Sequence, residues 1–235
     1  MELIAARTFN SLYIYLDIIW LVIYILVLII TKRHLAILAG IAGGLIYFLV
    51  DYGIFYQALG SRVIEGADPF WFLLWLSFSY GLTNFSWIWL LLDRDRFSVE
   101  WSLLPIIGWI AVALLSQNLG KNLQQISIYR TTSAYHGVMA LILFVGYLYL
   151  VVHNLRTEEK GDGRVNLLWL LAIGIGVQFS WEFILLITGI RPPEIMPLLV
   201  NSLVETNMGM PYLYLIHRSV SAKLNQDLSP KIKSN

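Results

Sequence analysis

Runs of apolar residues, separated by short polar segments, repeat along almost the whole chain. Each run is about twenty residues long, which is the length that an α-helix needs to cross the roughly 30 Å hydrocarbon core of a bilayer. We therefore predict an all-α fold, a polytopic bundle of seven transmembrane helices. The predicted spans are residues 11–31, 35–56, 70–92, 100–116, 133–153, 167–188 and 195–216.

Composition supports a membrane protein and excludes several other classes. Of the 235 residues, 58% are hydrophobic and 13% are charged, against about 25% charged residues in a soluble domain. The lipid bilayer is therefore the expected partner, and a soluble globular enzyme is excluded. A net charge of +1 provides no basic surface for nucleic acid. The lack of cysteine excludes thiolate metal sites and thiol nucleophiles.

Basic residues are distributed unequally over the two sides of the predicted bundle. Counted by alternate side, five Lys and Arg residues fall on the side of the N-terminus and eleven on the other side. Because Lys and Arg are enriched in cytoplasmic loops, the N-terminus is expected outside and the C-terminus in the cytoplasm. The loops are short, so we predict one transmembrane domain over residues 1–217 and a flexible cytoplasmic tail over residues 218–235.

Four acidic residues lie five or more residues inside the predicted spans: Asp17, Asp51, Glu182 and Glu205. An ionised side chain near the bilayer centre costs at least roughly 2.5–3.5 kcal/mol, so such residues are normally functional or paired. All four fall in the outer half of the bundle or near its midplane, and we expect them to converge on one cavity. Every Lys and Arg falls in a predicted loop or terminus. We therefore expect no cation beside the acids, and at least one acid protonated at neutral pH.

Polar and aromatic residues share helix faces with these acids at spacings of three or four residues, and a further such stripe carries no acid. Together they predict a pocket of carboxylates ringed by aromatic rings and amides. The candidate substrate-binding residues are Asp17, Tyr47, Tyr80, Asn84, Trp87, Gln178, Trp181 and Asn201. A neutral acid in such a pocket can act as a Brønsted acid, and aromatic faces can stabilise a developing cation.

Motifs for metals and cofactors are missing from the sequence. The densest acidic cluster, Asp93-Arg94-Asp95-Arg96, alternates with arginine and is interpreted as a solvated loop rather than a magnesium site. The four histidines never lie three or four residues apart, so di-iron boxes are missing as well. A retinal Schiff base needs a lysine within a span, and the predicted spans contain none. We therefore expect neither a metal nor a cofactor.

With seven spans, short loops and acids in the second and last spans, the chain resembles the integral-membrane terpene cyclases of fungal meroterpenoid and indole-diterpene pathways. In that family, an acid in the second span and an acid in the last span form the functional pair. The segment Leu49-Val50-Asp51-Tyr52 lies where the family has Trp-Glu, and Leu203-Val204-Glu205-Thr206 lies where it has an acid followed by Gly. A Trp-Glu string occurs instead in the sixth span, at Ser180-Trp181-Glu182.

The resemblance implies a metal-free reaction, the proton-initiated cyclisation of an epoxidised or olefinic prenyl chain. Glu205 and either Asp51 or Glu182 would protonate and later deprotonate this hydrophobic small-molecule substrate. The three acids are therefore the candidate catalytic residues of a membrane-embedded terpene cyclase.

Two other functions stay open on the sequence. One is a proton-coupled transporter for a small organic molecule, in which the same acids load and release protons. The other is a non-catalytic seven-helix receptor or scaffold. In such a protein each acid would be protonated and hydrogen-bonded to a neighbouring helix. Each of these hydrogen bonds would contribute about 0.6 kcal/mol on average to the association of the helices.

Overall fold

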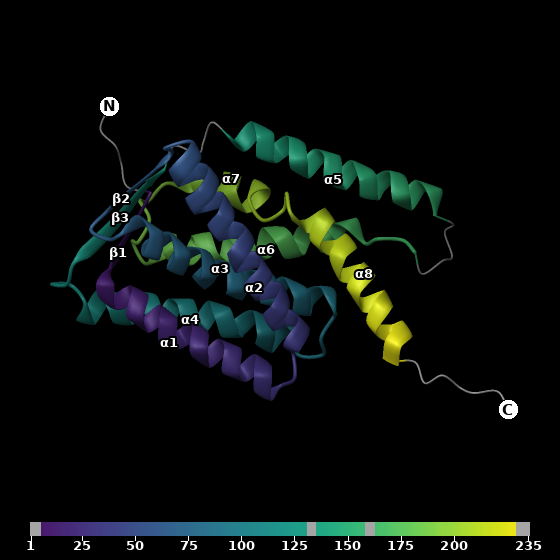
Figure 1. Ribbon diagram of the computed structural model, residues 1–235, viewed down its shortest axis with the longest axis horizontal. Helices are drawn as coiled ribbons and strands as arrows, with labels where there is room; N and C mark the ends of the chain where they lie inside the picture. The colour runs from purple at the N-terminus through teal and green to yellow at the C-terminus, as the bar shows by residue number, and fades with distance from the viewer. Residues whose placement is uncertain (1–5, 131–134, 158–162, 229–235) are drawn as a thin grey trace.

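The computed structural model describes residues 6–130, 135–157 and 163–228, with side chains up to residue 224. Within these residues the chain is mostly helical and contains eight helices and one small sheet (Figure 1). Five helical segments are long and apolar enough to cross a membrane, which is consistent with a polytopic helical membrane protein. They are α1 (Ser11–Ile30), α2 (His34–Phe48) with its π-helical continuation η1 (Leu49–Ala58), α4 (Ser98–Leu119), α5 (His136–Arg156) and α6 (Leu167–Ile187).

α3 (Pro69–Leu92) is the central helix of the bundle and packs most extensively on α2. A Cβ atom added at Gly81 of α3 would lie 2.6 Å from the Cα of Gly44 in α2. Because neither residue carries a side chain, the two backbones approach closely, as small residues allow in membrane helix pairs. On the outside of the bundle, large apolar side chains such as Ile30 and Leu155 are exposed. Such a surface suits lipid rather than water.

The helices follow the first six predicted spans, and the seventh is two helices instead of one. α7 (Ile195–Val204) ends before Glu205, and α8 (Met210–Leu228) begins after a turn of residues 205–209. Within this turn the Gly209 N–H donates to the Thr206 carbonyl, a tighter bond than the α-helical one. Pro211 then restricts the backbone conformation of Met210, and it has no N–H to donate a helical hydrogen bond.

The predicted C-terminal tail and the start of the predicted fifth span differ from the structure or fall partly outside the described residues. α8 runs from the predicted seventh span into the segment predicted as a flexible tail, as far as Leu228. Residues 229–235 lie outside the described residues, and so do residues 133–134 at the start of the predicted fifth span.

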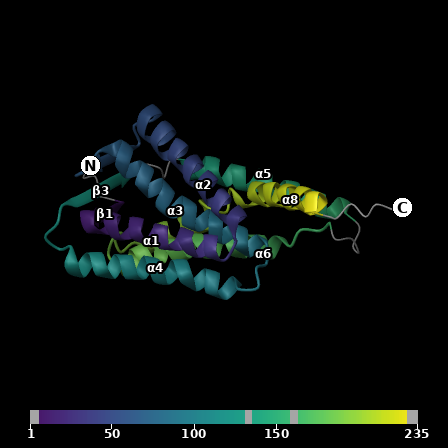
Figure 2. The ribbon, with the colours of Figure 1, turned by 60° about the horizontal axis from the view of Figure 1, so that its bottom comes forward.

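A three-stranded antiparallel sheet, which the all-α prediction missed, covers one end of the bundle. β1 (Arg7–Asn10) and β2 (Arg62–Glu65) pair with opposite edges of β3 (Gln125–Arg130), giving the order β1-β3-β2. Figures 1 and 2 both show the sheet at one end and the C-terminal end of α8 at the other. We call the first of these the sheet end.

At the opposite end, the two aspartates of the α3–α4 turn contact basic side chains of the α1–α2 turn and of α8. Arg33 Nε donates to Asp95 Oδ2 at 3.0 Å, and His217 Nε2 lies 2.6 Å from Asp93 Oδ1. Burial acts to raise the pKa of Asp95, but the hydrogen bond from the Phe97 N–H and the guanidinium of Arg33 outweigh it, so this pKa is lowered. These turns thus favour the ionised form of Asp95 in the folded protein.

Candidate functional site

The sheet places three arginines on the face that it turns toward the helices. In β3, Arg130 lies two residues after the buried Ile128, so both side chains fall on the same face. The register pairs Arg130 with Arg62 of β2 and Ile128 with Arg7 of β1, which puts all three arginines on that face. Arg7 and Arg62 are only 4% and 5% exposed. The strands therefore bring cations to the helix ends.

Glu182, near the C-terminal end of α6, is fully buried and accepts hydrogen bonds from four side chains. Arg7 Nη2 donates to Oε1 at 2.9 Å, and Arg191 Nη1 donates to Oε2. Gln178 Nε2 and Asn201 Nδ2 each donate to Oε1 at 3.3 Å. Three of these donors share Oε1 and one uses Oε2, so Glu182 accepts about as many hydrogen bonds as a carboxylate can.

Asp51, in η1, is held by one cation and one phenol. Arg62 Nη2 donates to Oδ1 at 2.9 Å, and Tyr80 Oη donates to Oδ2 at 2.8 Å. The Arg62 guanidinium also lies 4.5 Å from the ring centroid of Phe55, within the range of a cation–π interaction. Asp51 thus has two donors where Glu182 has four.

The prediction that the acids have no cationic partner is wrong for Asp51 and Glu182. Residues assigned to loops and to the N-terminus fold back over the helix ends: Arg7 and Arg62 from strands, and Arg191 from the loop after α6. Removing a charge from water costs several kcal/mol, which a well-placed opposite charge offsets. Ion pairs therefore compensate the burial of these two carboxylates, and the argument for a protonated acid applies only where such a partner is missing.

Glu205 lies at the start of the turn between α7 and α8 and is bonded differently. Gln178 Nε2 donates to its Oε2 at 2.9 Å, and this is its one side-chain hydrogen bond among the residues that the structure describes. The same amide group accepts a hydrogen bond from Thr206 through its Oε1 and also reaches Glu182. Gln178 therefore connects the two glutamates of α6 and the α7–α8 turn.

The charged groups at this end interact with one another. Burial lowers the pKa of Arg7 to about 10, Arg130 acts in the same direction, and Glu205 and Asp51 oppose it. Burial, followed by Arg7, lowers the pKa of Arg191 to about 10. Both arginines therefore keep their charge at neutral pH. We call this group the arginine–carboxylate cluster, and its members are Arg7, Arg62, Arg130, Arg191, Asp51, Glu182 and Glu205.

Several guanidinium nitrogens of the cluster are buried and have no hydrogen-bond partner in the described part of the chain. They are Nη1 of Arg7, Nε and Nη1 of Arg62, and Nε and Nη2 of Arg130. A buried donor without a partner costs about 1–3 kcal/mol. Planar guanidinium donors match carboxylate, phosphate and other oxygen-rich groups. The cluster is therefore suited to hold the oxygen-rich end of a ligand.

Aromatic rings adjoin the cluster and link α2, α3, α4 and α6. The ring centroid of Tyr80 lies 4.6 Å from that of Tyr47 and 6.2 Å from that of Trp181. Trp109 continues the row, 4.8 Å from Trp181 and 6.3 Å from Trp87. The sequence predicted four of these rings and missed Trp109, because the acid of α4, Glu100, lies at the end of its predicted span and marked no candidate face. Their π faces can stabilise a positive charge.

Two predicted residues, Asn84 and Asp17, lie outside both the hydrogen bonds of the cluster and the row of aromatic rings. Asn84 of α3 is fully buried, and neither its Nδ2 nor its Oδ1 has a partner within the described residues. Asp17 of α1 accepts a hydrogen bond from Trp75 Nε1 at 2.9 Å, and over the same residues no hydrogen bond or ion pair joins it to another acid. The structure thus brings together the other three acids and leaves Asp17 apart.

Sequence reasoning missed the arginines of the cluster, although a signal for them exists. Ile126, Ile128 and Arg130 alternate with more polar positions, and Arg7 and Phe9 do the same on β1. Period-two alternation with β-branched and aromatic residues is typical of a strand with one buried face. Arginines in phase with the buried positions were therefore recognisable as inward-facing.

Acid–base chemistry and anion recognition are what this arrangement can provide. Within the described residues, no three His, Asp or Glu side chains are grouped to hold a metal ion.

In comparisons with known proteins, the chain matches no protein-family model, no curated protein and no solved structure.

Proposed function

We propose that this chain is a multi-pass membrane enzyme that cyclises a hydrophobic prenylated substrate by proton transfer, as its resemblance to membrane terpene cyclases implies. In this proposal α3 and the broken helix α7–α8 cross the membrane together with the five long apolar helices. The sheet end faces outside and the C-terminus lies in the cytoplasm, in line with the distribution of Lys and Arg.

The proposal rests on the unequal bonding of the three acids in the cluster. Glu182 is saturated by four donors, and Asp51 has two. Glu205 has one neutral donor and, within the described residues, no guanidinium at ion-pair distance. A general acid must be free to hold and release a proton. We therefore assign the proton donor to Glu205.

The proposed reaction keeps the atoms of the substrate. The carboxyl group of Glu205 gives its proton to the epoxide oxygen, and the C–O bond breaks with its electron pair moving to oxygen. The π electrons of a neighbouring double bond attack the resulting carbocation and form a ring bond. The final cation loses a proton from an adjacent carbon to the Asp51 carboxylate, which leaves a double bond. The product is an isomer of the substrate.

Other residues hold the reactants in this proposal. The unpartnered N–H groups of Arg7 and Arg62 bind the oxygen-rich head of the substrate. Tyr80 and Trp181 present their ring faces to the carbocation. Glu182 is a positioning residue, because it fixes Gln178, which in turn holds Glu205.

Reconstituted protein tests the proposal with a panel of prenylated and epoxyprenylated aromatics. Chromatography with mass spectrometry should reveal a product of unchanged mass and altered retention. Glu205→Gln keeps the size and polarity of the side chain but removes its transferable proton, so we expect product formation to fall by roughly 10²-fold or more.

Glu65→Gln is the matched control, because Glu65 is exposed on β2 and lies outside the cluster. This variant should retain wild-type turnover. The same loss in both variants, or undiminished turnover by folded Glu205→Gln protein, would refute the assignment of Glu205.

The unpartnered guanidinium groups also favour a second candidate, a carrier for a small organic anion. A carrier would move a carboxylate or phosphate compound across proteoliposomes without changing its structure. Accumulation of unaltered substrate that depends on pH would support the carrier, and an isomerised product would support the cyclase.

A further inference from the structure

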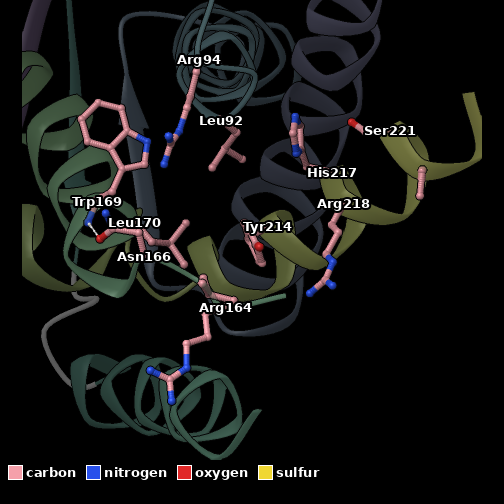
Figure 3. Close-up of a pocket in the computed structure, with 12 residues that line it drawn as sticks. Leu92, Arg94, Arg164, Asn166, Trp169, Leu170, Tyr214, His217, Arg218 and Ser221 are labelled. Carbon is pink, nitrogen blue, oxygen red and sulfur yellow. Dashed lines mark hydrogen bonds between the residues drawn. The ribbon is translucent and has the colours of Figure 1, made fainter. Parts of the chain in front are cut away.

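A second site lies at the end of the molecule opposite the sheet. A pocket of about 660 Å³ opens between the α3–α4 turn, the segment before α6, and α8. Figure 3 shows Arg94 and Arg218 on different sides of it, and Trp169, Leu170 and Tyr214 also line it. Its lining therefore combines cationic groups with apolar and aromatic surface.

Arg94 occupies a position in the chain that normally favours glycine. Its φ is +51°, in the left-handed region. The Asp95 N–H donates to the Leu90 carbonyl and the Arg94 N–H to the Leu91 carbonyl, the hydrogen-bond pattern of a helix that ends in a left-handed residue. A side chain there costs conformational energy.

The side chain of Arg94 is not engaged elsewhere in the described residues, where it makes no hydrogen bond and no ion pair. In Figure 3 its guanidinium extends into the space between Trp169 and His217. Among the residues that the structure describes, Arg218 Nη1 makes two long contacts, 3.3 Å to His153 Nε2 and 3.4 Å to the Gly163 carbonyl. Both arginines are therefore available to an anionic ligand.

Among the described residues, the polar groups of the pocket next to Arg94 are engaged with other partners. His217 lines the pocket and its Nε2 already contacts Asp93 Oδ1. The Asn166 side chain accepts a hydrogen bond from the Trp169 N–H as the N-cap of α6. Asp93 is thus held by His217 and directed to it rather than to Arg94.

We propose that this pocket binds the phosphate group of an amphiphile, with Arg94 and Arg218 as the residues that contact it. Guanidinium groups bind phosphate oxygens by charge-assisted hydrogen bonds. The apolar lining, including Leu92 and Leu170, accommodates the part of the chain next to that phosphate. The volume exceeds what one phosphate group needs and lies in the range of small-molecule sites. A phospholipid headgroup and a soluble phosphate ester share this chemistry.

The test uses full-length protein in nanodiscs of phosphatidylcholine with phosphatidic acid, and native mass spectrometry counts the retained lipids. We expect phosphatidic acid to be enriched over phosphatidylcholine. Arg94→Gly should reduce this enrichment roughly tenfold, because it removes a charge-assisted hydrogen bond to the phosphate. Arg218→Gln should act in the same direction.

Lys32→Gly is the matched control for Arg94→Gly. Lys32 is also basic, is also exposed at the end of a helix with a φ of +61°, and does not line the pocket. Glycine suits both backbone positions, so both variants should fold and melt at the same or a higher temperature. Lys32→Gly should retain the wild-type enrichment.

The outcomes separate the two sources of phosphate. Displacement of phosphatidic acid by millimolar inorganic phosphate would assign the site to soluble phosphate compounds, and resistance to it would assign the site to a lipid headgroup. No enrichment in the wild type, or an equal loss in Arg94→Gly and Lys32→Gly, would overturn the proposal.

Discussion

Replacing Glu182 with glutamine should destabilise the protein more than any other single carboxylate-to-amide change in the cluster. Glu182 is fully buried and accepts hydrogen bonds from Arg7, Arg191, Gln178 and Asn201. The glutamine side chain has the same size, but it removes the negative charge and turns one acceptor into a donor that faces a guanidinium. Two buried cations would then lose their partner at once.

The magnitude follows from the burial of these groups. Breaking a buried ion pair by removing one partner costs about 3–5 kcal/mol, because the other charge stays buried. The side chain of Arg191 is 10% exposed and can turn partly toward water, whereas that of Arg7 is 5% exposed. We therefore expect a loss of about 3 kcal/mol in the free energy of unfolding. For a chain of this size, this corresponds to a fall in Tm of roughly 6–12 °C.

The assay is the melting of full-length protein in detergent, followed by tryptophan fluorescence and by the loss of monodisperse protein on heating. Glu65→Gln should melt within about 2 °C of the wild type, because it changes an exposed residue. The double variant Glu182→Gln, Arg191→Gln should recover part of the loss, with a coupling energy of about 0.5–3 kcal/mol. A Glu182→Gln protein that melts within about 2 °C of the wild type would refute the inference that these ion pairs stabilise the sheet end.

Two further predictions concern the helix contacts and the turn at the opposite end. Gly81→Leu should cost about 1–3 kcal/mol or more, since a Cβ there meets the backbone of α2; Gly137→Leu, where an added Cβ meets nothing within 4 Å, should leave the Tm unchanged. Burial acts to raise the pKa of Asp95, but neighbours that include Arg33 lower it below its usual value. The contribution of the Asp95 carboxylate to stability is therefore present above about pH 4 and is lost as pH falls through the lowered pKa. Asp95→Asn should therefore lower the Tm at pH 7 and approach the wild-type Tm near pH 3, and a constant difference across this range would contradict the assignment.

The helices were predictable because their signal is long and repeated. An apolar run of about twenty residues leaves few alternatives to a membrane-spanning helix, and the first six predicted spans match helices of the structure. The break in the seventh depends on a single short segment. Gly209 and Pro211 weaken the helix there, but an apolar run that continues past them conceals the interruption when only hydropathy is considered.

The arginine partners were harder to predict because they depend on contacts between residues that are distant in sequence. Arg7 and Glu182 are 175 positions apart, and no local pattern pairs them. Counting Lys and Arg by side correctly put Arg7, Arg62 and Arg191 outside the spans but treated them as solvated. The strands that turn Arg7 and Arg62 inward contain only four residues each, too short to outweigh the helical signal around them.

The pairing of these acids constrains how a substrate would lie under the proposed function. The arginine–carboxylate cluster holds more guanidinium groups than carboxylates, so a carbocation formed among the arginines would be repelled. Tyr80, which donates to Asp51, begins a row of rings that continues through Trp181 to Trp109, and the faces of these rings attract positive charge. The oxygen-rich head of a substrate would therefore point to the sheet end and its reacting carbons to the aromatic row. Under the proposed function, Glu205 is the acid that transfers a proton between these two regions, because it has no ion pair among the residues that the structure describes.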